Sequence, residues 1–179
     1  VSVGGRAVPV DVAFGGAFYA IVDAEAAGIP VLPARLPELR ALGMRIAREV
    51  ERLRQVVHPE DVGLSGIYGT IFTGPAQGGE AHLRNVTVFA EAEVDRSPCG
   101  TGTAAVMAVL SEIGLLVDDV PFVHESIVGT TFTGRVVGRL RVGEREAIVP
   151  SIEGSAWMTG EHAFLIDGDD PLRAGFLLQ

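Results

Sequence analysis

The residues best suited to chemistry lie in one short segment, residues 95–103, with the sequence Asp-Arg-Ser-Pro-Cys-Gly-Thr-Gly-Thr. It contains Cys99, the only cysteine of the 179 residues, and a carboxylate, Asp95, four positions earlier. The glycines predict a turn, and the apolar run that follows predicts a helix over residues 103–113. Unpaired N–H groups and a partial positive charge at a helix N-terminus stabilise a thiolate. The segment therefore predicts a reactive cysteine.

Cys99 also has a structural interpretation, because a free cysteine usually packs as a small buried hydrophobic residue. Pro98 and the glycines favour an exposed turn, which leaves the two interpretations evenly balanced. On the reactive interpretation, the N–H groups at the helix start would bind a carboxylate and Asp95 would bind an ammonium group. These groups predict a site for a zwitterion such as an amino acid, although capping is the commoner role of an aspartate before a helix.

Two other motifs give weaker signals. The spacing Gly100-x-Gly102-x-x-Ala105 matches a dinucleotide fingerprint, but the glycines do not directly follow a strand and no second βαβ unit follows. The histidines are far apart and lack metal-ligand spacing, so we expect surface or hydrogen-bonded side chains and no metal site at His58, His82, His124 and His162.

Composition narrows the classes of function. The net charge of −9 and the absence of a basic run argue against nucleic acid as a partner, and no window is apolar enough for a membrane span. A single cysteine excludes an internal disulfide and favours the cytoplasm. The chain contains no lysine, so none of its own side chains can form a Schiff base with pyridoxal phosphate.

The elements that would position Cys99 follow from hydrophobic periodicity. We predict an amphipathic surface helix over residues 37–54 and a turn at 167–171. Alternating or apolar runs predict strands over residues 6–14, 18–22, 66–72, 83–89, 122–128, 131–140, 146–149 and 155–166. The helix over 103–113 is apolar on nearly all sides, which requires burial on all sides. We therefore expect one α+β unit with a mixed sheet wrapped around a central buried helix.

The segment 95–103 resembles the second catalytic-cysteine motif of the proline racemase family. The match extends to Gly15-Gly16-Ala17-Phe18-Tyr19-Ala20, to His124-Glu125-Ser126-Ile127-Val128-Gly129 and to the C-terminal residues Asp170-Pro171 and Gly175-Phe176. The family includes proline racemase, 4-hydroxyproline 2-epimerase and trans-3-hydroxyproline dehydratase. The resemblance implies a diaminopimelate-epimerase-like fold of two lobes, no cofactor and no metal. It also implies proton transfer by two cysteines, one on each side of the substrate α-carbon.

The resemblance further implies roles for individual residues. Cys99 matches the catalytic cysteine of the second lobe, and Asp95 matches the aspartate that contacts the substrate nitrogen. The N–H groups of Gly100 and Thr101 match half of the carboxylate cradle. Phe89 matches an aromatic residue that packs against the pyrrolidine ring. Family dehydratases usually carry threonine at the position of Cys99, so a cysteine there favours epimerisation.

The chain departs from the family in length and in its cysteines. The Met-Cys-Gly-His-type motif that carries the first catalytic cysteine is absent, and family members are considerably longer. We therefore expect residues 1–179 to form the second lobe of a two-lobe racemase or epimerase of proline or a hydroxyproline, with a tail at about 167–179 that packs on the first lobe. An isolated chain would then be inactive, and the alternatives are a trans-3-hydroxyproline dehydratase and a catalytically incomplete binding or assembly lobe. An uncovered interface around Phe176, Leu177 and Leu178 would favour a homodimer.

Overall fold

The body of the protein is a mixed eight-stranded sheet. The computed structural model describes residues 1–3 and 5–177. The strands follow the order β10-β9-β8-β6-β5-β4-β3, with the short β7 paired to β6. The pairs β4/β5 and β6/β8 are parallel and the other pairs are antiparallel. The strands comprise β3 (Asp11–Phe14), β4 (Phe18–Asp23), β5 (Ile67–Gly74), β6 (Leu83–Phe89), β7 (Glu93–Val94), β8 (Phe122–Ser126), β9 (Thr131–Val142) and β10 (Arg145–Glu153).

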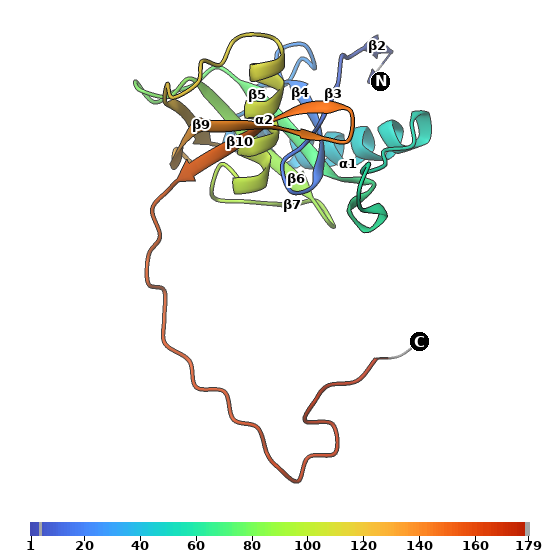
Figure 1. Ribbon diagram of the computed structural model, residues 1–179, viewed down its shortest axis with the longest axis vertical. Helices are drawn as coiled ribbons and strands as arrows, with labels where there is room; N and C mark the ends of the chain where they lie inside the picture. Colours follow the sequence, from blue (N-terminus) through green and yellow to red (C-terminus); the bar gives the residue numbers. More distant parts are fainter. Residues whose placement is uncertain (4, 178–179) are drawn as a thin grey trace.

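The sheet curls around helix α2 (Gly100–Glu112). The helix contacts β3 and β4 at one end of the sheet and β9 and β10 at the other, which is only compatible with a curved sheet (Figure 1). Ala105, Val106 and Met107 are completely or almost completely buried against it. The predicted α+β arrangement of a mixed sheet around a buried helix is confirmed. The burial is uneven, however, because Ile113 just beyond the helix is 60% exposed.

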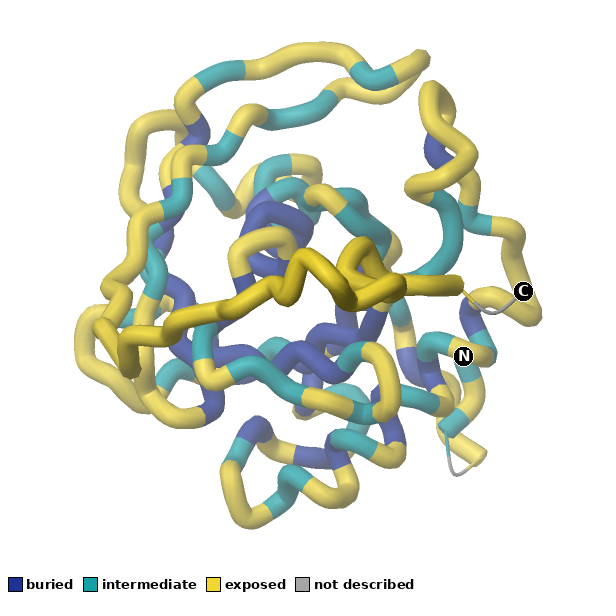
Figure 2. The backbone as a smooth tube through the Cα atoms, turned by 90° about the horizontal axis from the view of Figure 1, so that it is seen from below, coloured by how far each residue is buried: buried dark blue, intermediate teal, exposed yellow. Residues whose placement is uncertain are grey.

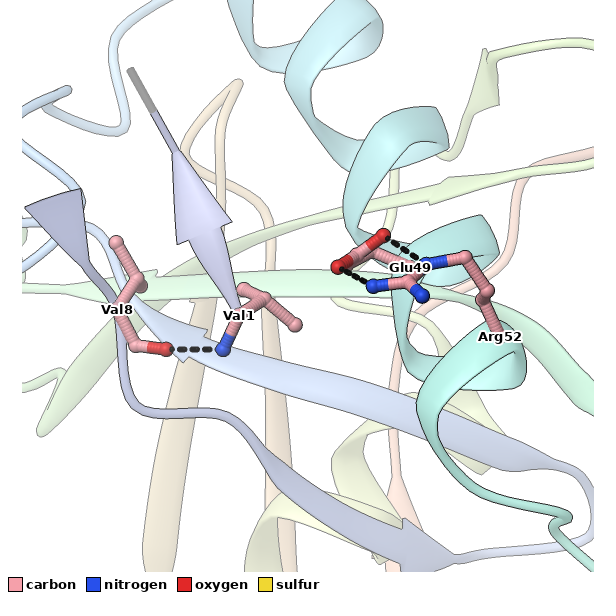
Figure 3. Close-up of polar contacts among 4 residues, drawn as sticks. All are labelled: Val1, Val8, Glu49 and Arg52. Atoms are coloured by element: carbon pink, nitrogen blue, oxygen red, sulfur yellow. Dashed lines mark hydrogen bonds and ion pairs between the residues drawn. The ribbon is translucent and has the colours of Figure 1, made fainter. Parts of the chain in front are cut away.

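Helix α1 (Leu36–Leu53) covers the opposite face of the sheet. Its apolar side packs on strand residues such as Phe72 and Val86, and consists of Leu39, Leu42, Ile46 and Val50. The polar side faces outward, where Glu49 and Arg52 form an ion pair at 2.7 Å (Figure 3). The amphipathic surface helix predicted over 37–54 is therefore confirmed, shifted by one residue.

The predicted strand over residues 6–14 is interrupted. Its first part forms β2 (Arg6–Ala7), which pairs with β1 (Ser2–Val3) in a separate ribbon, and its last part is β3. The Val1 amino group donates to the Val8 carbonyl at 3.0 Å and closes this ribbon (Figure 3). Pro9 explains the interruption, because proline has no N–H to donate to a ladder.

The predicted strand over residues 155–166 is wrong. Residues 154–177 contain no strand, are exposed throughout and lead away from the body (Figures 1 and 2). The apolar runs at 156–158 and 163–166 suit a strand, but a strand requires a paired edge, and the described residues provide none beside this segment. Turns do occur near the predicted position, with Asp170 N–H donating to the Asp167 carbonyl.

The remaining elements are two short 3-10 helices, η1 (Pro33–Arg35) and η2 (Val62–Leu64). Over the described residues, no helix combines the length and apolar character that crossing a membrane would require.

Candidate active site around Cys99

Cys99 is the N-cap residue of α2. Its sulfur accepts a hydrogen bond from Gly102 N–H at 3.3 Å, and its own N–H donates to the Ser97 hydroxyl at 3.2 Å. Because the sulfur caps the helix, α2 begins at Gly100, three residues before the predicted start. The side chain is largely buried, with 8% of the residue exposed. The thiol therefore lies at the N-terminus of a buried helix, as the sequence predicts.

The backbone of Cys99 adopts an unusual conformation, with φ 65° and ψ 123°. This conformation lies outside the left-handed helical region, where ψ is near 47°, and costs an L residue about 1–3 kcal/mol. Surrounding contacts must hold it in place. Such conformations concentrate at functional sites, which makes Cys99 a stronger candidate than its sequence motif alone.

The first N–H groups of α2 are available to a ligand. Those of Gly100 and Thr101 donate to no acceptor in the described part of the chain, and both residues are exposed. Two adjacent N–H groups at the N-terminus of a helix favour an anion such as a carboxylate. The carboxylate cradle expected at these two residues is therefore sterically open.

Tyr19 of β4 joins the site, although we assigned it no role from its sequence context. Its hydroxyl lies 2.6 Å from the Thr101 hydroxyl and 3.7 Å from the Cys99 sulfur. Burial raises the pKa of Tyr19 well above its ordinary value, a hydrogen bond to Thr101 opposes the rise, and the nearby Cys99 adds to it. Tyr19 therefore keeps its proton and can donate it to either neighbour. The signals in the sequence were a tyrosine within an apolar strand and its place in the family-like segment 15–20, and neither assigned it a role.

Gly15 and Gly16 form the turn between β3 and β4 and allow this turn to approach the N-terminus of α2. A Cβ on Gly15 would overlap the Thr101 carbonyl oxygen and lie 2.6 Å from the Ala105 nitrogen. A Cβ on Gly16 would lie 2.8 Å from the Thr101 side chain. The glycine pair is therefore required so that β4 can bring Tyr19 to Cys99.

Phe89 is connected to Cys99 through aromatic rings. It stacks on Tyr68 with a centroid distance of 5.7 Å, and Tyr68 meets Tyr19 edge-on at 5.7 Å. Tyr68, the middle ring of this row, is 53% exposed and is therefore accessible from solvent. The row runs from Tyr19, which touches the thiol, to Phe89, whose role against a substrate ring stays a prediction.

Asp95 directly follows β7, which pairs with the end of β6 near Phe89. The segment from Asp95 to Pro98 then runs beside β6, since the Pro98 carbonyl accepts from Asn85. Asp95 is half-buried, and its side chain forms no hydrogen bond or ion pair with other described residues. It remains available to a cationic group.

The part of the chain that the structure describes contains no group of three His, Cys, Asp or Glu side chains arranged to hold a metal ion. Of the histidines, His124 is completely buried and hydrogen-bonded to Thr103, as expected for a structural histidine.

Comparison with known proteins identifies relatives of this arrangement. Residues 1–177 match the family model described as proline racemase. The chain is 47% identical over 169 residues to a trans-3-hydroxy-L-proline dehydratase of Bacillus thuringiensis, covering 94% of the chain and 51% of the relative. It is 40% identical over 171 residues to a proline racemase of Acetoanaerobium sticklandii, covering 96% of the chain and 51% of the relative.

A solved structure shows the same fold. The hydroxyproline epimerase from Agrobacterium vitis, with bound trans-4-hydroxy-L-proline, superimposes with a TM-score of 0.81 at 35% identity. The match covers 96% of this chain and 49% of that one. The chain therefore spans about half the length of the relatives it matches.

Proposed function

Because this chain belongs to the proline racemase family, we propose that it supplies one half of a racemase or epimerase acting on proline or a hydroxyproline without a cofactor. The observation that carries the proposal is the position of the Cys99 sulfur at the N-terminus of α2. The sulfur accepts a hydrogen bond from Gly102 N–H and lies next to the open N–H groups of Gly100 and Thr101. A thiol and an anion-binding backbone are the two features needed to remove a proton next to a carboxylate.

In the proposed mechanism, the Cys99 thiolate removes the α-proton from one face of the amino acid. A second thiol delivers a proton to the opposite face, which inverts the stereocentre. Between the two transfers, the electron pair on the α-carbon delocalises into the carboxylate. The N–H groups of Gly100 and Thr101 stabilise the charge that develops there.

Two further residues would position the substrate. Asp95 is half-buried and unpaired within the described residues, so its carboxylate would bind the substrate nitrogen and keep it cationic. Phe89, at one end of the aromatic row, would pack on the pyrrolidine ring. Cys99 must be reduced for this chemistry, and a reducing compartment such as the cytoplasm would keep it so.

The second thiol must come from outside this sequence, which has one cysteine. We place it on a partner lobe corresponding to the half of the relatives that this chain does not span. Residues 1–179 would then be one lobe of a diaminopimelate-epimerase-like fold, and the segment 167–179 would pack on the other lobe. The exposed Phe176 and Leu177 support a covered tail or a homodimer, while Leu178 lies outside the described residues.

The test is α-hydrogen exchange followed by proton NMR in D₂O, with L-proline and with trans-4-hydroxy-L-proline. We expect the 179-residue chain to exchange without inversion, and Cys99→Ser to lose the exchange. Inversion by the chain alone would show that a second proton donor is present and would remove the need for a partner lobe. Exchange that persists in Cys99→Ser would remove Cys99 from the mechanism. If neither protein exchanges, the chain is a catalytically incomplete binding lobe.

A trans-3-hydroxyproline dehydratase is the second candidate, because a relative at 47% identity carries that name. Cys99 argues for epimerisation, since family dehydratases usually have threonine there. Incubation with trans-3-hydroxy-L-proline in the presence of the partner lobe separates the two. Formation of a pyrroline without a D-isomer would establish the dehydratase.

A further inference from the structure

Three buried polar side chains meet next to the peptide group that precedes Cys99. Asn85 on β6, Thr103 on α2 and His124 on β8 are all completely buried. The Nδ1 atom of His124 lies 3.0 Å from the Thr103 hydroxyl and 3.2 Å from the Asn85 amide nitrogen. None of these contacts takes part in the proposed proton transfer, so they need an explanation of their own.

The network converges on the peptide groups that flank Cys99. The Pro98 carbonyl accepts from the Asn85 amide at 2.8 Å and from the Thr103 hydroxyl at 3.3 Å. The Cys99 carbonyl accepts from Thr103 N–H at 2.8 Å. Both peptides on either side of the Cys99 α-carbon are therefore held by hydrogen bonds. These hydrogen bonds hold φ and ψ of Cys99 and prevent the residue from relaxing to a less strained conformation.

The hydrogen bonds also assign the histidine tautomer. The Asn85 amide nitrogen has two protons, and one is directed to the Pro98 carbonyl. The other is directed to His124 Nδ1, which must then act as an acceptor because the amide nitrogen has no lone pair to offer. The Thr103 hydroxyl has a single proton, so it donates either to Nδ1 or to the Pro98 carbonyl. A neutral His124 consequently carries its proton on Nε2, which has no partner among the described residues. Burial supports the neutral form, because it lowers the pKa of His124 to about 3.

We propose that Asn85, Thr103 and His124 are positioning residues that hold the peptides around Cys99 and thereby direct its sulfur toward the N-terminus of α2. The importance of this arrangement for catalysis rests on the proposed function, in which Cys99 transfers the proton. The hydrogen-bond geometry is independent of that role and can be tested without a substrate.

The first experiment measures alkylation of Cys99 by iodoacetamide at pH 7.5, followed by intact mass. The single cysteine makes the signal unambiguous. Thr103→Val removes the hydroxyl but keeps the shape, and we expect the rate constant to fall about tenfold as the sulfur loses its hydrogen bond from Gly102. Thr103→Ser restores the hydroxyl and should restore the rate.

Thr70→Val is the matched control. Thr70 is also completely buried, and its hydroxyl donates to the Gly43 carbonyl at 2.8 Å on the α1 side of the sheet. The Thr70→Val variant loses a comparable hydrogen bond, but far from Cys99's flanking peptides, and its Cys99 should keep the parental alkylation rate. If Cys99 is alkylated at the same rate in the parent chain and in Thr103→Val, the proposal is overturned.

A second measurement needs no substitution in the network. Long-range proton–nitrogen NMR of the unmodified chain should show His124 with its proton on Nε2, and a proton on Nδ1 would contradict the assigned network. Neither measurement involves an amino-acid substrate. A failure of α-hydrogen exchange would therefore reject the proposed function and leave these results unaffected.

Discussion

The hydroxyl oxygen of Tyr19 lies 2.6 Å from the hydroxyl oxygen of Thr101, and both lie 3.7 Å from the sulfur of Cys99. Tyr19 comes from β4 and the other two residues from the N-terminus of α2, about 80 positions later in the chain. The contact joins the sheet to the helix at the thiol. A single hydroxyl on a buried ring therefore contributes to both the packing and the candidate active site.

Replacing Tyr19 with phenylalanine should remove this contact without creating a large cavity. We expect the free energy of unfolding to fall by about 1 kcal/mol, because the Thr101 hydroxyl loses its partner. Urea denaturation measures the change. The control is Tyr68→Phe, since Tyr68 is 53% exposed and should change stability by less than about 0.5 kcal/mol. Equal losses in the two variants would contradict a specific role for the Tyr19 hydroxyl.

Gly15 should not tolerate a side chain. In Gly15→Ala, the new Cβ would overlap the backbone of Thr101 and Ala105, and backbone atoms cannot move aside as a flexible side chain can. We expect a loss of about 1–3 kcal/mol or more in the free energy of unfolding, measured by urea denaturation. Gly79→Ala is the control, because nothing lies within 4 Å of the added atom. A stable Gly15→Ala protein would show that β3 and α2 are farther apart than described.

His124 should make the protein sensitive to acid. Burial lowers its pKa from 6.5 to about 3, so between these values the unfolded chain binds a proton that the folded chain does not. Stability from this residue is therefore complete above about pH 6.5 and is lost as the pH falls toward 3, with a slope approaching about 1.4 kcal/mol per pH unit.

Urea denaturation at several values between pH 4 and pH 7 measures that slope. His124→Gln should reduce it, even if the variant is less stable at neutral pH. His162→Gln is the control, because His162 lies in the exposed segment and its replacement should leave the slope unchanged. An identical slope in His124→Gln and the parent would show that other groups cause the acid sensitivity.

Removing the exposed segment should leave the folded body intact. Truncation after Gly154 removes a segment whose described residues, 155–177, have no buried side chains, so the free energy of unfolding should change by less than about 0.5 kcal/mol. Trp157, Phe164 and Leu165 are 77%, 90% and 95% exposed, and their removal should reduce self-association in analytical ultracentrifugation. A large loss of stability would mean that the segment packs on the body in solution.

Local patterns in the sequence determined much of the fold. The helix spacing of Leu39, Leu42 and Ile46 predicted an amphipathic helix, and the apolar run after residue 103 predicted a buried one. Both predictions hold because hydrophobic periodicity reports which side of an element is covered. The same local signals put Cys99 at the start of α2, beside Gly100 and Thr101. These features needed no knowledge of distant contacts.

Other features depended on contacts that only the tertiary structure supplies. Sheet pairing and curvature bring Tyr19 and His124 to the segment around Cys99 from distant strands, and neither residue carried a local signal of that role. The cysteine sulfur moved the helix start to Gly100 by acting as its cap. Residues 155–166 had the apolar runs of a strand but no neighbouring edge to pair with. An apolar run records a preference for burial, whereas a strand also needs hydrogen bonds from another segment, and these are decided by the whole fold.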